Sequence, residues 1–176
     1  MTAAPPLLLA YDDAAGGWME TFVPFTLLHV ASVAFFGFLM AGACWLGRCW
    51  RETPREAKFR RLWGWVSLSY STWYTVFYLL PRNFDWTKAL PCQLCDLAAF
   101  TAGIAMVTHA RWARTLLYFW GIGLSTQAFI SPTLQYGVGS IWFWLFWINH
   151  TIIVGSAMYE IVVCHYRPGP RALRFA

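Results

Sequence analysis

Long apolar runs alternate with short polar connections along this chain. Five of the runs are long enough to cross a membrane as helices, which takes about 20 residues each. They cover roughly residues 22–47, 62–81, 90–109, 113–133 and 139–163. A transmembrane barrel would instead show strands of about ten residues with alternating polarity, a pattern that these runs lack. The sequence therefore predicts an all-α protein, a polytopic transmembrane helical bundle of about five spans.

The composition fits a protein dissolved in lipid. Of its 176 residues, 59% are hydrophobic, 19% aromatic and 12% charged, and the mean hydropathy is +0.46. A water-soluble domain carries about 25% charged residues. The formal charge of +5 comes from short basic clusters between apolar runs, unlike the basic face that binds nucleic acid. We therefore expect membrane lipids as partners and no nucleic acid.

The basic residues also indicate how the chain is oriented in the membrane. Eleven of them fall on one side of the predicted bundle: Arg48, Arg51, Arg55, Lys58, Arg60, Arg61, Arg111, Arg114, Arg167, Arg171 and Arg174. The other side has Arg82 and Lys88. Because loops rich in arginine and lysine stay in the cytoplasm, we expect the N-terminus outside and the C-terminus inside.

Three segments are expected. Residues 1–21 form an acidic non-cytoplasmic tail, which lacks the basic region and the long apolar stretch of a signal peptide. Residues 22–163 form the transmembrane helical domain. Residues 164–176 form a basic cytoplasmic tail or the start of a sixth span, because RALRFA resumes an apolar pattern where the sequence stops.

Polar side chains inside the spans are the candidates for a site, because ionisable groups in lipid are costly and are usually functional. With a rise of about 1.5 Å per residue, most of them fall in the outer half of the bundle: His29, Cys95, Asp96, Gln127, Asn149 and His150. Each also has an ordinary role open to it, such as a hydrogen bond between helices, a helix cap, an ion pair with Lys88 or simple packing. Their similar depth favours one cavity that faces the outer leaflet.

The polar groups near the inner face indicate no site. Glu160 is expected to reach the inner interface with its flexible side chain. Cys44, Cys49 and Cys164 are expected to be plain thiols in a reducing cytoplasm, with lipidation as the alternative.

The stretch LPCQLCDLAAF, residues 90–100, contains two thiols and a carboxylate. Cys92 and Cys95 have the C-x-x-C spacing of a redox pair, and CQLC resembles the C-x-L-C of the quinone-linked DsbB-type thiol oxidases. Those enzymes need a second cysteine pair in an outer loop, and the outer connections RNFDWTK and PTLQYGVG contain no cysteine. A zinc site is also disfavoured, because two thiols and a histidine lack an evident fourth ligand.

A nucleophilic cysteine is the other chemical interpretation of this stretch. A thiolate attacks acyl carbonyls well once a base has taken its proton, and His150 on another span is the candidate base. Asp96 would orient His150 across the bundle, and Gln127 or Asn149 would donate to the oxyanion. The lipid substrate would enter from the surrounding leaflet, and no cofactor or metal is required.

Four motifs carry a resemblance to a known family: FTLLH at 25–29, LPCQLCDLAAF at 90–100, YFWGIGLSTQAFISP at 118–132 and WINHTIIVGSAMYEIVV at 147–163. They resemble the YwaF-like bacterial integral membrane proteins, which are related to transmembrane protein 164 and, more widely, to the AIG/ADTRP-type hydrolases. The animal member of the family acts as a cysteine acyltransferase that moves a long fatty acyl chain between phospholipids. The resemblance implies an acyl thioester on Cys95, with His150 as base and then acid, in a bacterial cytoplasmic membrane.

The sequence departs from the family motif at two positions. Gln93 stands where the family commonly has histidine, and Cys92 is additional. Residue 93 points about 200° away from Cys95 on a helix, so the chemistry of Cys95 is expected to remain possible. Two alternatives stay open beside acyl transfer or acyl hydrolysis: a DsbB-like quinone-linked thiol oxidase, and a non-enzymatic transporter or receptor-like bundle.

Overall fold

The computed structural model describes residues 17–81 and 94–169, and the regular structure in these ranges is helical apart from one isolated β-bridge. The prediction of an all-α fold is confirmed. In chain order the helices are α1 (Gly17–Glu20), α2 (Leu27–Cys49), α3 (Pro54–Leu79), α5 (Leu94–Thr108), α6 (Arg111–Leu117), the π-helix η1 (Tyr118–Leu124), α7 (Gln127–Ile130) and α8 (Ile141–Val162).

Two of the described helices, α2 and α8, are long and apolar enough to span a membrane, and α5 is a shorter apolar helix. The helix α3 is longer than these two, with 26 residues, but it begins with the basic sequence PREAKFRR. The chain is therefore a helical protein with two candidate membrane spans, and the count of five spans stays a prediction.

The fourth apolar run, predicted as one span over 113–133, is divided into three pieces, α6, η1 and α7. In η1 the turn is wider than in an α-helix, and the amide of Ser125 donates to the carbonyl of Trp120, five residues earlier, at 2.9 Å. Gly121 lies so close to α8 that a Cβ there would be 2.8 Å from the Cβ of Ala157. A π-helix changes the direction of the residues that follow it and is frequent at functional sites.

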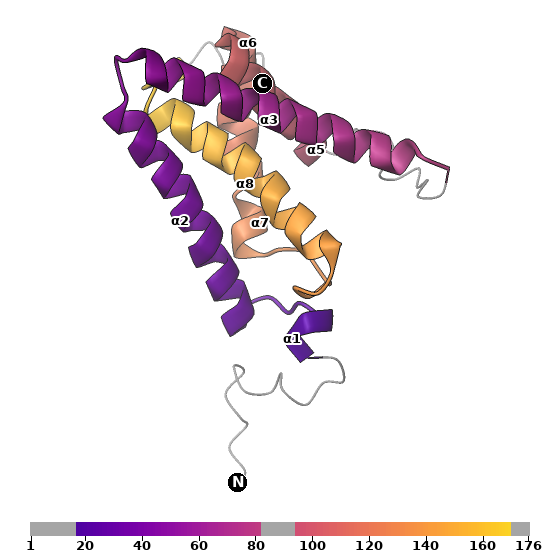
Figure 1. The fold of residues 1–176 in the computed structure, drawn as a ribbon. Coiled ribbons are helices and arrows are strands. Elements are labelled where there is room, and N and C mark those ends of the chain that lie inside the picture. The colour runs from indigo at the N-terminus through magenta and orange to yellow at the C-terminus, as the bar shows by residue number, and fades with distance from the viewer. Residues whose placement is uncertain (1–16, 82–93, 170–176) are drawn as a thin grey trace.

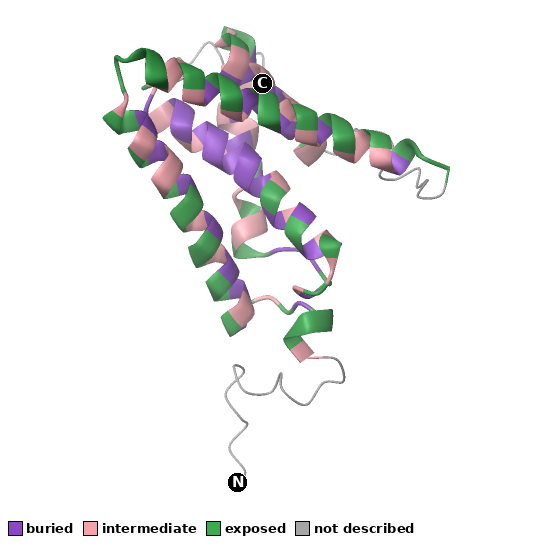
Figure 2. Cartoon of the chain, viewed as in Figure 1, coloured by how far each residue is buried: buried purple, intermediate pink, exposed green. Residues whose placement is uncertain are grey.

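The helices are arranged around α8 (Figure 1). α2 and α3 diverge from the short basic connection between them like the arms of a V, and α8 runs between the arms, with α5, α6 and α7 behind it in this view. Figure 2 shows that α8 is largely buried, whereas the outer face of α2 is exposed. The exposed residues of α2 include Leu27, Phe38 and Trp45. A continuous apolar face of this kind marks contact with lipid or with another protein.

Small residues bring α3 and α5 into close contact. A Cβ at Gly64 would lie 2.7 Å from Val107 and 3.0 Å from the carbonyl oxygen of Gly103, and a Cβ at Gly103 would lie 2.6 Å from Leu68. Helices in membranes commonly approach each other through such small residues. This crossing fixes the position of α5, whose first turn carries Cys95 and Asp96.

The described end of the predicted tail is attached to the segment that precedes α8. The amide of Phe22 donates to the carbonyl of Gln135 at 3.0 Å, and the amide of Gly137 donates to that of Glu20 at 2.9 Å. A Cβ at Gly137 would lie 2.5 Å from the carbonyl oxygen of Trp18, so only glycine allows the two backbones to come this close. This pairing holds the connection before α8 in place.

Glu160 differs from its prediction. It is 2% exposed, and it accepts from Nε of Arg114 at 2.8 Å and lies 2.7 Å from Nη2 of the same side chain. The expectation that its side chain reaches out of the protein was wrong, because Arg114 on α6 lies close enough to pair with the carboxylate inside the protein.

Candidate functional site

One cavity of about 550 Å³ lies at the end of the bundle where α3 ends and α8 begins. Its walls come from the last turns of α3, the first turn of α5, the region from η1 to α7, the connection 131–136 and the first half of α8. The start of α8 is fixed by Ser140, whose hydroxyl accepts from the amide of Trp142 at 3.3 Å and so caps the helix. The cavity is thus built where several element ends meet.

Five of the six predicted site residues line this cavity: Cys95, Asp96, Gln127, Asn149 and His150. They come from α5, α7 and α8, which are distant in the sequence. His29 is not among the lining residues. Cys92 and Gln93 lie outside the described residues. The structure therefore brings a thiol, a carboxylate, an imidazole and two amide side chains to one volume.

The ring of His150 is oriented by its own helix. Its Nδ1 lies 2.8 Å from the carbonyl oxygen of Phe146. A carbonyl only accepts, so Nδ1 carries the proton of this hydrogen bond. In the neutral ring Nε2 then has the lone pair, which is the arrangement that a general base requires. The backbone of Phe146 thus holds the ring through Nδ1, and an orienting role for Asp96 stays a prediction.

His29 has a different arrangement. Its Nδ1 accepts from the amide of Phe25 at 3.0 Å, and its Nε2 lies 3.0 Å from the carbonyl oxygen of Phe129. Both nitrogens are thus engaged with the backbone, with the proton on Nε2. His29 is buried and joins α2 to α7, the helix that carries Gln127. It therefore helps to hold α7, which forms part of the cavity wall.

Asp96 and Asn149 lie near each other in the site. Both line the large cavity, and both also line a second, small cavity of about 10 Å³ between α3, α5 and α8. The small cavity is lined as well by Ser71, Tyr74 and Thr75 of α3. Ala99 and Phe100 complete its lining, and the hydroxyls of Ser71 and Thr75 donate to carbonyls of α3 itself.

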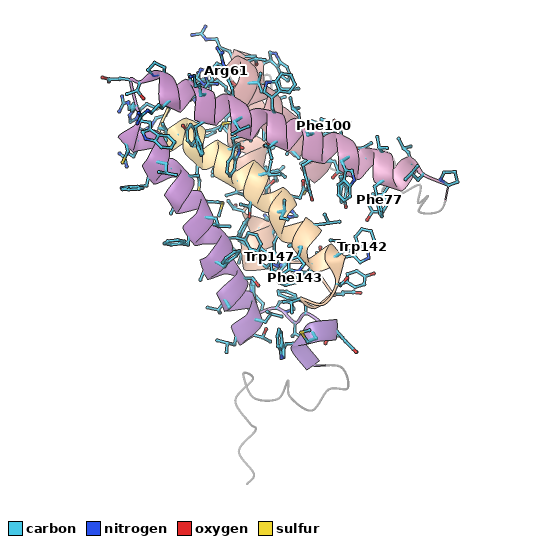
Figure 3. The ribbon with its side chains drawn as sticks, viewed as in Figure 1. Arg61, Phe77, Phe100, Trp142, Phe143 and Trp147 are labelled. Carbon is cyan, nitrogen blue, oxygen red and sulfur yellow. The ribbon has the colours of Figure 1, made fainter. Side chains whose placement is uncertain are left out.

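Aromatic side chains of α3 and α8 form one wall, which we did not predict. Tyr74 and Tyr78 line the cavity together with Trp142. The rings of Tyr78 and Trp142 stack with centroids 5.6 Å apart, and Phe77 meets Trp142 at 6.0 Å, as Figure 3 shows at the end of α3. The spacing of Tyr70, Tyr74 and Tyr78, four residues apart, is the sequence signal that indicates a shared helix face.

The described residues that line this cavity contain no group that the spacing of a metal ion would fit. Among the residues that the structure describes, the group of His, Cys, Asp or Glu side chains close enough to hold an ion is His109, Glu160 and Cys164. That group lies toward the other end of α8. Cys95 is a free thiol and is half-buried.

Comparison with known proteins identifies the family. Residues 23–176 match the TMEM164 family, so the chain belongs to that family. Neither the curated proteins nor the solved structures that were compared contain a match. The resemblance found in the sequence is therefore confirmed at the level of the family, for a helical membrane protein with two candidate spans.

Proposed function

We propose that this member of the TMEM164 family moves a fatty acyl group from one membrane lipid to an acceptor through a thioester on Cys95. His150 acts as the general base and then as the general acid. The observation that carries the proposal is the single cavity that both residues line, from α5 and α8. Its volume of about 550 Å³ falls in the range of ligand pockets, about 300–1,000 Å³.

The first step transfers the acyl group to the protein. Nε2 of His150 takes the proton of the Cys95 thiol, and the thiolate sulfur attacks the ester carbonyl of a phospholipid. A carbon–sulfur bond forms and the ester carbon–oxygen bond breaks. The imidazolium then returns its proton to the alkoxide that leaves, which gives a lysophospholipid and acyl-Cys95.

The second step releases the acyl group. The hydroxyl of a second lysophospholipid attacks the thioester while His150 takes its proton, and the thiolate of Cys95 leaves and recovers that proton. With water in place of the lysophospholipid, the same step gives a free fatty acid. Gln127 and Asn149 supply amide N–H donors for the oxyanion that forms in both steps.

The test is an acyl-exchange assay with the purified protein in phosphatidylcholine vesicles. The donor carries an isotope-labelled acyl chain, and lysophosphatidylcholine is the acceptor. We expect Cys95→Ala to reduce transfer to the background, and His150→Ala to lower the rate about 10²–10⁴-fold, as the loss of a general base does. The matched control is Cys49→Ser, which removes an exposed thiol at the end of α2 and keeps the wild-type rate.

The alternatives give other results in the same assay. Wild-type transfer by Cys95→Ala would contradict the proposed thioester on Cys95. No exchange by the wild type, and no oxidation of a thiol substrate, would favour a transporter or receptor-like bundle. A quinone-linked thiol oxidase would be favoured by a different result. The wild type would then exchange no acyl groups but would oxidise a thiol substrate, and Cys92→Ala and Cys95→Ala would lose this oxidation equally.

A further inference from the structure

A second group of reactive side chains lies at the far end of α8. Glu160 follows His150 by ten residues, which is about 15 Å along a helix axis. It faces His109, which stands between α5 and α6, and Cys164, which follows the end of α8. None of the three lines the cavity at the other end.

The three ligand atoms are close to the spacing that a metal ion imposes. Nε2 of His109 lies 3.6 Å from Oε1 of Glu160 and 3.9 Å from Sγ of Cys164, and all three atoms lie within 4.8 Å of one another. Tetrahedral zinc, with bonds of about 2.0–2.3 Å, holds neighbouring nitrogen, oxygen and sulfur ligands about 3.3–3.5 Å apart. The two distances from Nε2 of His109 would each shorten by a few tenths of an ångström on binding, whereas Oε1 of Glu160 and Sγ of Cys164 are known to lie within 4.8 Å of each other.

Glu160 has one oxygen to spare. Arg114 engages Oε2 at 2.7 and 2.8 Å. The other oxygen, Oε1, has no hydrogen-bond partner among the described residues. The side chain is only 3% exposed, so this oxygen is also shielded from water. A buried carboxylate oxygen without a partner is costly. Monodentate coordination of a cation satisfies it, and Arg114 then orients the carboxylate as outer hydrogen-bond partners do in metal sites.

Neighbouring arginines are positively charged and would repel a cation bound here, so their partners matter. Arg114 is paired with Glu160, and Arg60 donates to the carbonyl of Met106 and lies 3.4 Å from Glu56. Cys164 is a free cysteine, so a bound ion must displace its thiol proton. Zinc does this readily, because it binds thiolate strongly.

We propose that His109, Glu160 and Cys164 form a zinc site. Zinc accepts Nε2 of His109, Oε1 of Glu160 and Sγ of Cys164, releases the thiol proton to water, and keeps water as its fourth ligand. This combination of imidazole, thiolate and carboxylate suits zinc better than calcium or magnesium, which prefer oxygen ligands in larger number.

The site links parts of the chain that are far apart in the sequence. His109 ends α5 in a left-handed conformation, with φ of 55°, and Cys164 lies just after α8. A metal bound between them fastens the α5–α6 junction to the end of α8. Because the unfolded chain does not hold these ligands together, zinc stabilises the folded protein. This inference is independent of the proposed acyl transfer.

The test measures metal binding by the purified full chain. Protein in detergent is freed of metal with a chelator and titrated with Zn²⁺ and with Co²⁺, whose thiolate charge-transfer absorption reports a sulfur ligand. We expect one equivalent to bind, the cobalt band to appear, and the midpoint of thermal unfolding to rise with Zn²⁺.

Three variants separate coordination from folding. Cys164→Ser and His109→Asn, chosen because asparagine tolerates a positive φ, should each weaken Zn²⁺ binding at least about tenfold and abolish the cobalt band or shift it. Cys49→Ser removes an exposed thiol and should bind as the wild type does. A wild type without a cobalt band, or a Cys164→Ser variant with wild-type affinity, would overturn the proposal and leave a hydrogen-bonded network in its place.

Discussion

Two histidines of this bundle show how hydrogen bonding separates residues that look alike in the sequence. His29 uses both ring nitrogens to join α2 to the backbone of α7. His150 gives Nδ1 to the carbonyl of Phe146 and lies in the cavity lining with Cys95. The first arrangement holds the fold together, and the second fixes the tautomer with a lone pair on Nε2.

Replacing His29 should affect stability more than catalysis. His29→Ala leaves the amide of Phe25 and the carbonyl of Phe129 without their partner, which costs about 1–3 kcal/mol for a buried group. The midpoint of thermal unfolding in detergent should fall, while the folded fraction exchanges acyl groups at the wild-type turnover rate.

His150→Ala provides the comparison for that measurement. It should lose turnover by the factor given for a general base, in protein that remains folded. If His29→Ala and His150→Ala lose equal turnover at matched folded fractions, the different hydrogen bonding of the two imidazoles does not distinguish a structural histidine from a general base.

At the scale of the elements, the sequence predicted the helices better than their ends. The apolar runs indicated α2, α5 and α8 because burial in lipid requires long uncharged stretches. The division of the fourth run was not predicted. It lies where Gly121 approaches Ala157 closely, and this contact between residues far apart in the sequence is invisible in the local pattern. The pairing of Gly137 with the segment before α2 was missed for the same reason.

The α3–α5 crossing gives a prediction at this scale. Gly64→Val adds side-chain atoms where a Cβ alone would lie 2.7 Å from Val107, so the helices must separate, at a cost of about 1–3 kcal/mol. Thermal unfolding in detergent measures the loss, and acyl exchange should fall too because α5 carries Cys95.

Gly37→Ala on α2 is the matched control. A Cβ there has no atom within 4 Å, so stability should be unchanged or slightly higher, as expected for alanine in a helix. If Gly64→Val is as stable as Gly37→Ala, the close crossing does not position α5.

At the scale of the whole molecule, the candidate chemistry lies at two opposite parts of α8. The cavity with Cys95 and His150 is near its first half, and the group around Glu160 is at its end. Depth along the helices grouped six candidate residues, and five of them line one cavity, because a helix converts sequence position into distance along its axis. The burial of Glu160 was not predicted by its depth, since its partner Arg114 comes from another helix.

The distribution of basic residues predicts which side of the membrane each part faces. Cys49, exposed at the basic end of α2, should react with a membrane-impermeant maleimide only after the cytoplasmic side is opened. Tyr136→Cys in a Cys49→Ser background places a thiol at an exposed position near the cavity and should react in intact cells. The reverse labelling pattern would contradict the proposed orientation, with the N-terminus outside.

The central claim is that Cys95 carries the acyl group, and its most direct test is to trap that state. The purified protein is mixed with a phospholipid that has an isotope-labelled acyl chain, quenched in acid and analysed by mass spectrometry of its peptides. The account predicts one labelled acyl group on the peptide that contains Cys95, removed by hydroxylamine and formed more slowly in His150→Ala. Acyl exchange that proceeds with no acyl adduct on Cys95 at any time point would contradict it.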